Sequence, residues 1–227
     1  MLKKITSLLL SLCLSAAAVS GLTVTASAAE TTGKMTEYGF LKNGVYHIQT
    51  AEHLKNISNA SNASKDADHL VNTQTFVLDN DIKLTDNDAN LVNIASNQSS
   101  NLSGAVFQGV FDGNGHTISG LKYTTHLIAT GLFGYTKGAT IKNLVIESAD
   151  INATYIGGIV AGQADDTDFI NVSVRNSTMT CLPGNGSIAV FTDAGMSVGA
   201  LAGQAGNGSL IYNCESVNTS LNGPEVV

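Results

Sequence analysis

The fold is decided by the stretch Gly131-Leu132-Phe133-Gly134 and, shortly after it, Thr140-Ile141-Lys142-Asn143-Leu144. Two similar stretches follow: Gly158-Ile159-Val160-Ala161-Gly162 with Asp168-Phe169-Ile170-Asn171-Val172, and Gly199-Ala200-Leu201-Ala202-Gly203 with Leu210-Ile211-Tyr212-Asn213-Cys214. The three asparagines are 28 and 42 residues apart, and an inserted loop at Cys181–Ser197 explains the longer second interval. A weaker copy, Thr117–Leu121, aligns with Thr140–Leu144 at an offset of 23. The chain therefore contains an internal repeat.

Each copy consists of short apolar runs bounded by Gly, Asn, Asp and Ser. Such runs are too short for helices and predict β-strands. A period in the twenties with two or three strands per unit is typical of a parallel β-helix, a solenoid whose coils stack about 4.8 Å apart. Asn suits its corners because Asn tolerates a left-handed backbone and can bond to its copies above and below. We therefore predict an all-β fold.

Upstream of the repeat, Gly44–Ile48 alternates like a strand, and Thr50 stands where the N-cap of a helix beginning at Ala51 belongs. Phe76–Leu78 and Asp81–Leu84 predict two further short strands. A solenoid needs a cover over the apolar face of its first coil. The helix with its strand is expected to be that cover, a short N-terminal α-helical cap.

Several segments of this sequence resemble the sequence motifs of the GLUG-motif proteins, which are bacterial surface and secreted proteins named after the motif Gly-Leu-apolar-Gly. Gly131–Gly134 matches their signature, Tyr46–Leu54 their opening strand and helix, Leu78–Ile82 the next segment and Phe107–Leu121 the beginning of their coil. The resemblance covers about Tyr46 to Asn218, and it departs where the second and third units carry an extra residue before Gly162 and Gly203. It implies a right-handed parallel β-helix on or shed from a bacterial cell, often beside an adhesin or an immunoglobulin-cleaving metallopeptidase.

The first 28 residues read as a signal peptide. Lys3 and Lys4 precede an apolar run from Ile5 to Leu22, and Ala26-Ser27-Ala28 suits signal peptidase. The apolar core is too short to span about 30 Å of hydrocarbon, and no later stretch is apolar enough to cross a membrane. We therefore expect a secreted or cell-surface protein.

The rest of the chain is expected to divide into four parts. They are a flexible segment at 29–43, the cap with the first coils at 44–105, the GLUG-like repeats at 106–223, and a truncated or open end at 224–227.

Charge excludes one class of partner. The chain has 11 Lys+Arg against 18 Asp+Glu, a net charge of −7, and Arg175 is its sole arginine. Nucleic-acid binding needs a basic surface to contact phosphates. The expected partner is an extracellular glycan or protein.

Catalytic candidates are few. The five histidines lack the His-Glu-x-x-His spacing of zinc peptidases. Asp165, Asp166 and Asp168 form a carboxylate cluster that His116 and Arg175 could join. Glycosidases use two carboxylates, about 6.5–9.5 Å apart in inverting enzymes. Adjacent aspartates at a turn are more often simply solvated, so a carbohydrate-active enzyme is the alternative and a non-catalytic module the leading hypothesis.

Two further sites stay open. Asp86, Asp88 and Asn90, near Asp79 and Asp81, suggest Ca²⁺, although Leu91 and Asn97 stand where an EF-hand needs Gly and Glu. Cys181 and Cys214 could pair in an oxidising compartment, or could be two small buried residues. No other cofactor is indicated.

The leading hypothesis is a β-helix that presents its faces and loops for adhesion or interaction with glycans or proteins. A third possibility is that the chain is the N-terminal fragment of a larger surface protein.

Overall fold

The structure, a computed structural model, describes residues 33–63, 68–86, 88, 92–96, 105–182, 197–206 and 208–223. The chain divides into two units, Met1–Thr32 and Gly33–Val227. The first unit lies outside the described residues, and with it the expected signal peptide at 1–28. The account below concerns the second unit.

An antiparallel meander opens this unit. It comprises β1 (Lys34–Thr36), β2 (Gly39–Lys42) and β3 (Val45–Ile48). The sequence predicts a flexible segment over 29–43, yet β1 and β2 lie within it. Strand β2 is held by backbone hydrogen bonds to the predicted strand β3. Neither strand belongs to a repeat unit, so the repeat pattern does not predict this pairing.

Helix α2 (Ala51–Asn62) follows β3, and Thr50 is its N-cap as predicted. Thr50 Oγ1 accepts a hydrogen bond from the backbone N–H of His53 at 3.3 Å. The inner face of the helix buries Leu54 and Ile57 in the main hydrophobic core. A 3₁₀-helix, η2 (Asp68–Thr73), then leads to β4 (Thr75–Leu78), which pairs in parallel with β3.

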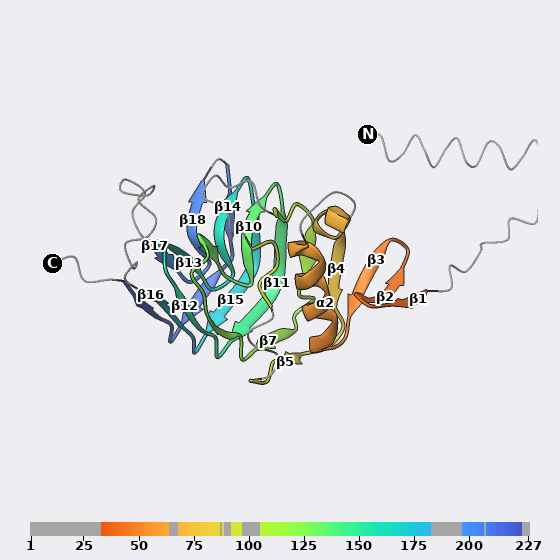
Figure 1. Cartoon of the computed structure of the whole chain (residues 1–227), viewed down its shortest axis with the longest axis horizontal. Coiled ribbons are helices and arrows are strands. Elements are labelled where there is room, and N and C mark those ends of the chain that lie inside the picture. The colour runs from red at the N-terminus through yellow and green to blue at the C-terminus, as the bar shows by residue number, and fades with distance from the viewer. Residues whose placement is uncertain are drawn as a thin grey trace, which may run out of the picture. The chain divides into compact units, whose positions relative to one another are not determined.

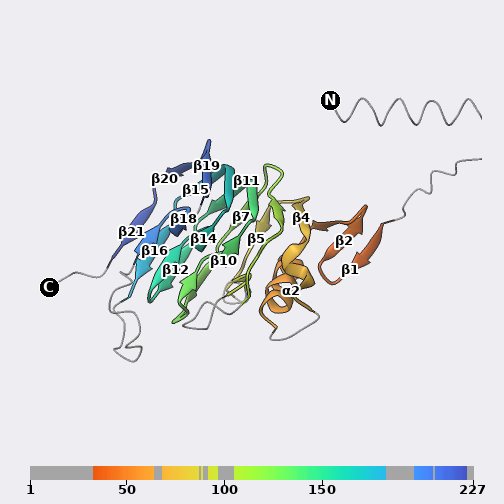
Figure 2. The same cartoon turned by 90° about the horizontal axis from the view of Figure 1, so that it is seen from above.

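The remaining chain consists of short strands that stack in parallel upon one another (Figures 1 and 2). They are β5 (Ile82–Lys83), β6 (Val110–Asp112), β7 (Thr117–Ser119), β8 (Lys122–Thr124), β9 (Ala129–Thr130), β10 (Phe133–Lys137), β11 (Thr140–Glu147), β12 (Asp150–Ala153), β13 (Ile156–Gly158), β14 (Ala161–Asp165), β15 (Asp168–Arg175), β16 (Thr178–Cys181), β17 (Ser197–Gly199), β18 (Ala202–Gly206), β19 (Leu210–Tyr212), β20 (Glu215–Val217) and β21 (Ser220–Asn222).

These strands form four sheets. The largest runs β1-β2-β3-β4-β6-β11-β15-β19, with β5, β7 and β20 alongside; the others are β10-β14-β18, β8-β12-β16-β21 and β9-β13-β17. The described chain is thus mostly β with one α-helix, and its stacked parallel sheets are consistent with a β-solenoid.

The register confirms the alignment of the three strong repeats. Ile141 pairs with Phe169, and Phe169 pairs with Ile211. The extra residue of the second unit is absorbed between Gly158 and Gly162, because Phe133 pairs with Ala161. The repeat spacing alone therefore predicts which side chains share a column.

The weaker fourth copy was aligned wrongly. Thr117 pairs with Val145, an offset of 28 rather than 23, and Val110 is the residue that pairs with Thr140. The turn Gly113–His116 accounts for the error. It makes the connection from β6 to β7 two residues longer than the matching part of β11, so apolar similarity matches Thr117–Leu121 to the wrong half of that strand.

Inward-facing columns make up the core. One runs through Phe76, Phe111, Ile141 and Phe169, all fully buried. The repeat glycines line the tightest corners: a Cβ on Gly158 would overlap the carbonyl oxygen of Ala161. The glycines of the motif therefore serve close backbone packing between coils.

Candidate functional site

The repeat asparagines form a hydrogen-bonded ladder. Asn143, Asn171 and Asn213 all have a left-handed backbone, with φ of 50°, 55° and 51°. Asn171 Nδ2 donates to Asn143 Oδ1 at 2.9 Å, and Asn213 Nδ2 donates to Asn171 Oδ1 at 2.7 Å. These are the corner positions that the sequence predicts, with the predicted bonding between copies.

Asp112 stands at the base of this ladder and fixes its direction. Asn143 Nδ2 donates to Asp112 Oδ1 at 3.0 Å, and a carboxylate can only accept. Burial opposes ionisation of Asp112, but hydrogen bonds from Asn143 and Asn114, with Lys142 3.3 Å away, outweigh it and keep the pKa of this carboxyl below its usual value. Every amide above must therefore point its nitrogen towards Asp112 and its oxygen away.

Sequence reasoning missed a second ladder. Asn176 Nδ2 donates to Glu147 Oε1 at 3.0 Å, and Asn218 Nδ2 donates to Asn176 Oδ1 at 3.3 Å. Both asparagines have positive φ. Their 42-residue spacing, the same as that of Asn171 and Asn213, was the available signal. A carboxylate again stands at the base, so both ladders point the same way.

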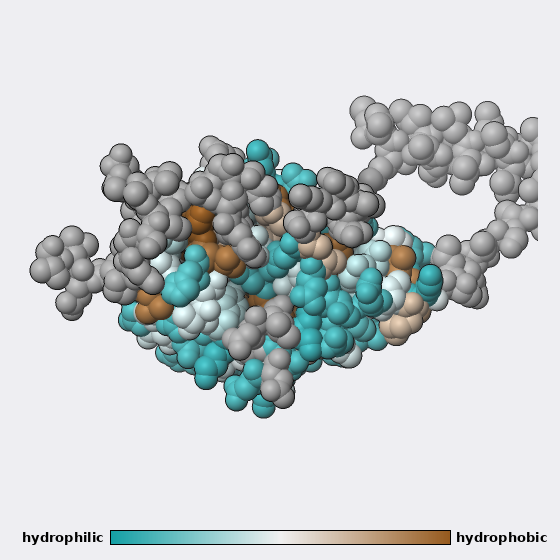
Figure 3. Space-filling view, viewed as in Figure 1, coloured by the Kyte–Doolittle hydropathy of each residue, from teal (hydrophilic) through white to brown (hydrophobic). Residues whose placement is uncertain are grey.

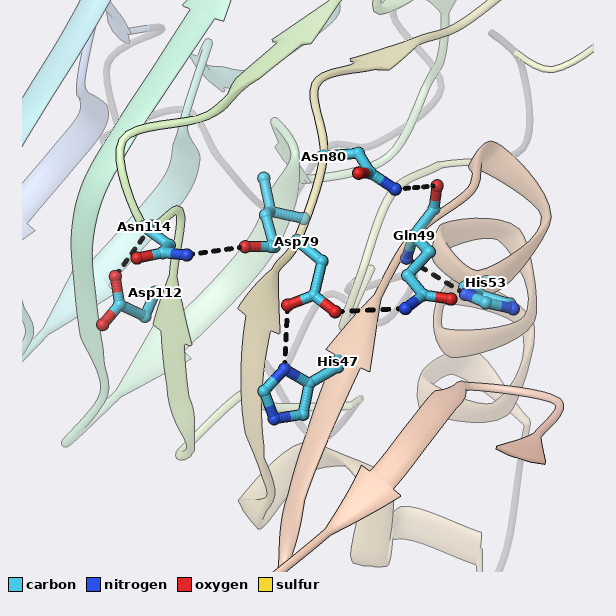
Figure 4. A network of polar contacts seen from close by, with 8 residues as sticks. His47, Gln49, His53, Asp79, Asn80, Asp112 and Asn114 are labelled. Atoms are coloured by element: carbon cyan, nitrogen blue, oxygen red, sulfur yellow. Dashed lines mark hydrogen bonds and ion pairs between the residues drawn. The ribbon is translucent and has the colours of Figure 1, made fainter. Parts of the chain in front are cut away.

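A polar network joins the first ladder to residues that follow β3 and β4 (Figure 4). Asp79 binds His47 Nδ1 at 2.8 Å and accepts from Gln49 Nε2 at 3.1 Å. Burial opposes its ionisation, yet these two bonds keep the pKa of Asp79 low. Asn114 Nδ2 donates to the carbonyl of Leu78 at 3.2 Å, while its backbone N–H donates to Asp112. Polar contacts thus run from the cap into the coils.

The aspartate cluster lies at one corner. Asp165 ends β14, Asp166 is exposed with φ 47°, and Asp168 begins β15. Asp165 Oδ2 accepts from Tyr135 Oη at 2.8 Å. Burial, with the Asp165 contact, raises the pKa of Tyr135 to about 12. The three acids therefore follow one another around a turn instead of facing each other across a groove.

The residues expected to assist this cluster are engaged elsewhere. His116 Nδ1 lies 3.1 Å from Asp81 Oδ1, and Arg175 Nη2 lies 2.7 Å from Glu215 Oε1. Arg175 ends β15, the strand that Asp168 begins. The geometry does not bring a general acid and base together at this corner.

The calcium candidates do not converge either. Asp88 Oδ1 accepts from Lys55 Nζ at 3.2 Å, and Asp88 Oδ2 accepts from Thr85 Oγ1 at 2.7 Å. Asp86 is exposed, and Asn90 lies outside the described residues. Within the described ranges, no three His, Cys, Asp or Glu side chains are grouped to hold a metal ion.

Cys181 and Cys214 are both free thiols. Cys181 is buried at the end of β16, and Cys214 is half-buried between β19 and β20, in a different sheet. Burial raises the pKa of the Cys181 thiol. The reading as two small packed residues thus fits the structure better than a disulfide.

A polar cleft of about 620 Å³ lies between helix α2 and the sheet of β8 and β12. Ser58, Asn59 and Asn62 line it from the helix, and Lys122, Thr124, Asp150 and Asn152 from the sheet. Lys122 and Asp150 are neighbours in the register. Figure 3 shows mainly hydrophilic surface around α2. The volume falls within the range of ligand sites, but the lining is more polar than most.

Part of this lining is fixed by hydrogen bonds. Asn62 Nδ2 donates to the Asn93 carbonyl at 2.7 Å, and Asn62 Oδ1 accepts from the Ser96 backbone at 2.6 Å. The buried Asn93 Oδ1, by contrast, has no hydrogen-bond partner among the described residues. Among the described residues that line the cleft, Asp150 is the one carboxylate.

Comparison of the chain with family models, curated proteins and solved structures finds no match. In the described part of the chain, no helix has both the length and the apolar character needed to span a membrane.

Proposed function

We propose that the protein is a non-catalytic, secreted or cell-surface module that binds an extracellular glycan in the polar cleft beside α2. One observation carries the proposal: the lining is rich in amides and hydroxyls and includes Lys122 and Asp150 on adjacent strands. Such groups match the many hydroxyls of a saccharide, each of which both donates and accepts hydrogen bonds.

The finer description of the fold belongs to the same proposal. We take the stacked coils to be a right-handed parallel β-helix of the GLUG-motif kind, with α2 as its N-terminal cap. The resemblance of Gly131–Gly134 and the burial of Leu54 and Ile57 on the inner face of α2 support this. A rigid support of this kind holds a binding surface in place at little entropic cost.

The binding test is a glycan array with the full chain, followed by titration of the best ligand. Asp150→Ala should weaken binding by about tenfold, the usual effect of losing one hydrogen bond to a charged group. Thr178→Ala is the matched control, because Thr178 pairs with Asp150 one coil further on and lies outside the cleft lining. Equal loss in both variants would count against the cleft.

A turnover assay addresses the enzymatic alternative. The proposal expects no release of reducing ends from bacterial or host polysaccharides. Turnover that disappears in Asp166→Asn would overturn the non-catalytic assignment.

Secretion has its own test. Mass spectrometry of the protein from a bacterial culture medium should show Ala29 as the first residue. Retention of Met1 in a cytoplasmic product would contradict the proposed location.

A further inference from the structure

The sheet β8-β12-β16-β21 carries a column of polar side chains that begins in the cleft and continues beyond it. Strand pairing aligns Thr124, Asn152, Thr180 and Asn222, one from each strand. Thr124 and Asn152 line the cleft, whereas Thr180 and Asn222 extend the column along the stack. Figure 2 shows β12, β16 and β21 following one another in this order. A ligand that fills the cleft can therefore continue over the next two strands.

The side chains of this column point away from the core. Side chains alternate between the two faces of a strand, and the residues that precede the column on β12 and β16 are the fully buried Ile151 and Met179. The four members of the column are exposed or half-buried. Their hydroxyl and amide groups therefore lie on the outer face of the sheet.

Hydrogen bonds within the column repeat every two coils. Asn152 Nδ2 donates to Thr124 Oγ1 at 3.3 Å, and Asn222 Nδ2 donates to Thr180 Oγ1 at 3.3 Å. A threonine hydroxyl that accepts still has a proton to donate, and an amide that donates still has an oxygen that can accept. Each Asn–Thr pair thus offers one donor and one acceptor. The pairs recur at about 9.6 Å, because coils stack about 4.8 Å apart.

The charges of the site favour an uncharged ligand. Among the described residues that line the cleft, Lys122 is basic and Asp150 is acidic, and the two are neighbours in the register. The column itself consists of neutral side chains. A polyanionic glycan would be matched by an excess of basic side chains.

We propose that the cleft and this column together bind an uncharged, linear β-1,4-linked chain of N-acetylated amino sugars, laid along the stack of coils. The inference rests on the proposed function, because it identifies the glycan that the cleft receives. An acetamido group has one N–H donor and one carbonyl acceptor, the complement of one Asn–Thr pair. Successive rings of such a chain are turned over, so acetamido groups recur on one side at every second sugar. The Asn–Thr pairs recur in the same way at every second coil.

Oligomers of N-acetylglucosamine test the length of the site on the full chain. In calorimetric titrations the hexasaccharide should bind about tenfold more tightly than the disaccharide, because only the longer chain extends from the cleft over β16 and β21. The matched hexasaccharide of β-1,4-linked glucose has a hydroxyl in place of each acetamido group. It should bind about tenfold more weakly than the N-acetylated hexasaccharide.

Two matched variants place the longer chain on the column. Thr180→Val keeps the shape of the side chain and removes its hydroxyl. It should weaken binding of the N-acetylated hexasaccharide about fivefold and leave binding of the disaccharide unchanged. Thr178→Val makes the same change on the same strand but outside the column, and it should alter neither affinity.

The outcomes separate this inference from the function of the cleft. Equal affinity for the two lengths, equal binding of the two hexasaccharides, or equal loss in the two variants would overturn the inference and leave glycan binding in the cleft intact. The same holds if the N-acetylglucosamine oligomers do not bind while another glycan binds and Asp150→Ala weakens it. If no glycan binds, the proposed function is overturned and this inference with it.

Discussion

At the N-terminal end of the stack, α2 lays the fully buried Leu54 and Ile57 against the core, whereas at the other end Ile211 and Leu221 are about half exposed. The edge strands differ in the same sense. Lys34 occupies the apolar column at β1, and Ile211 occupies it at β19. The edge strand at the first end thus carries a charged side chain, which disfavours pairing with a further strand, whereas the edge strand at the other end carries an apolar one.

The difference also has a direction. The ladders start on carboxylates that lie towards the covered end and present amide oxygens at the exposed end. A stack of this kind can be extended at one end only by a segment that donates. A solenoid built from apolar columns alone would lack this polarity.

The largest expected effect separates the covered end from the exposed end. Leu54→Ala removes a fully buried side chain from the inner face of α2 and should lower the free energy of unfolding by about 2–5 kcal/mol. Leu221→Ala, at a half-exposed position of the last coil, should cost less than about 1 kcal/mol. Urea unfolding of both variants measures this. Similar losses would mean that the last coil is as tightly packed as the cap.

A ladder variant gives the next largest effect. Asn171→Ala loses bonds to Asn143 and Asn213 and places Ala at φ 55°, so it should cost about 2 kcal/mol. Asn213→Ala breaks one ladder bond and should cost less. Asn171→Gly removes the strain that Ala adds at this φ, so the difference between the Ala and Gly variants reports the backbone cost. Equal losses for Asn171→Ala and Asn213→Ala would mean that the second ladder bond adds no stability.

The repeat itself could be predicted from the sequence because columns in a solenoid repeat at the sequence period. Asn143, Asn171 and Asn213 were placed correctly, since the chain needs the same corner in each coil. The copy at Thr117–Leu121 was placed wrongly, because the Gly113–His116 turn adds two residues between β6 and β7 and the repeat spacing does not predict this insertion. Strands β1 and β2 escaped notice for a similar reason: they belong to no repeat.

The candidate site was beyond sequence reasoning. Asn59 of α2 and Asp150 of β12 line one cleft, although 91 residues separate them, because the packing of the helix decides which sheet it faces. The direction of the ladders was equally hidden, because it depends on a contact between Asn143 and Asp112, the last residue of β6, which lie 31 residues apart and so outside the repeat spacing of 28. Both the cleft lining and the direction of the ladders are determined by tertiary contacts of elements that lie outside the repeat.

The helix cap offers a smaller test of the covered end. Thr50→Ala removes the hydrogen bond to the His53 N–H and should cost about 1 kcal/mol. Thr50→Ser keeps the hydroxyl and should be nearly neutral. Thermal unfolding followed by circular dichroism compares the two variants. If Ala and Ser behave alike, the N-cap bond does not help to hold α2 over the core.

The smallest effect at neutral pH is expected for Asp112→Asn, because an amide oxygen can still accept from Asn143 and Asn114. The difference should emerge in acid. The pKa of Asp112 is held below its usual value in the folded protein, so its contribution is complete above about pH 4, the unfolded value, and is lost as the pH falls through the folded pKa. Urea unfolding at a series of pH values should therefore show that the free energy of unfolding falls more steeply in acid for the native chain than for Asp112→Asn.

Asp79, whose pKa is also lowered, should leave part of this fall in the variant. Parallel curves would mean that Asp112 does not anchor the ladder as a carboxylate, and the fixed direction that distinguishes the two ends would lose its source.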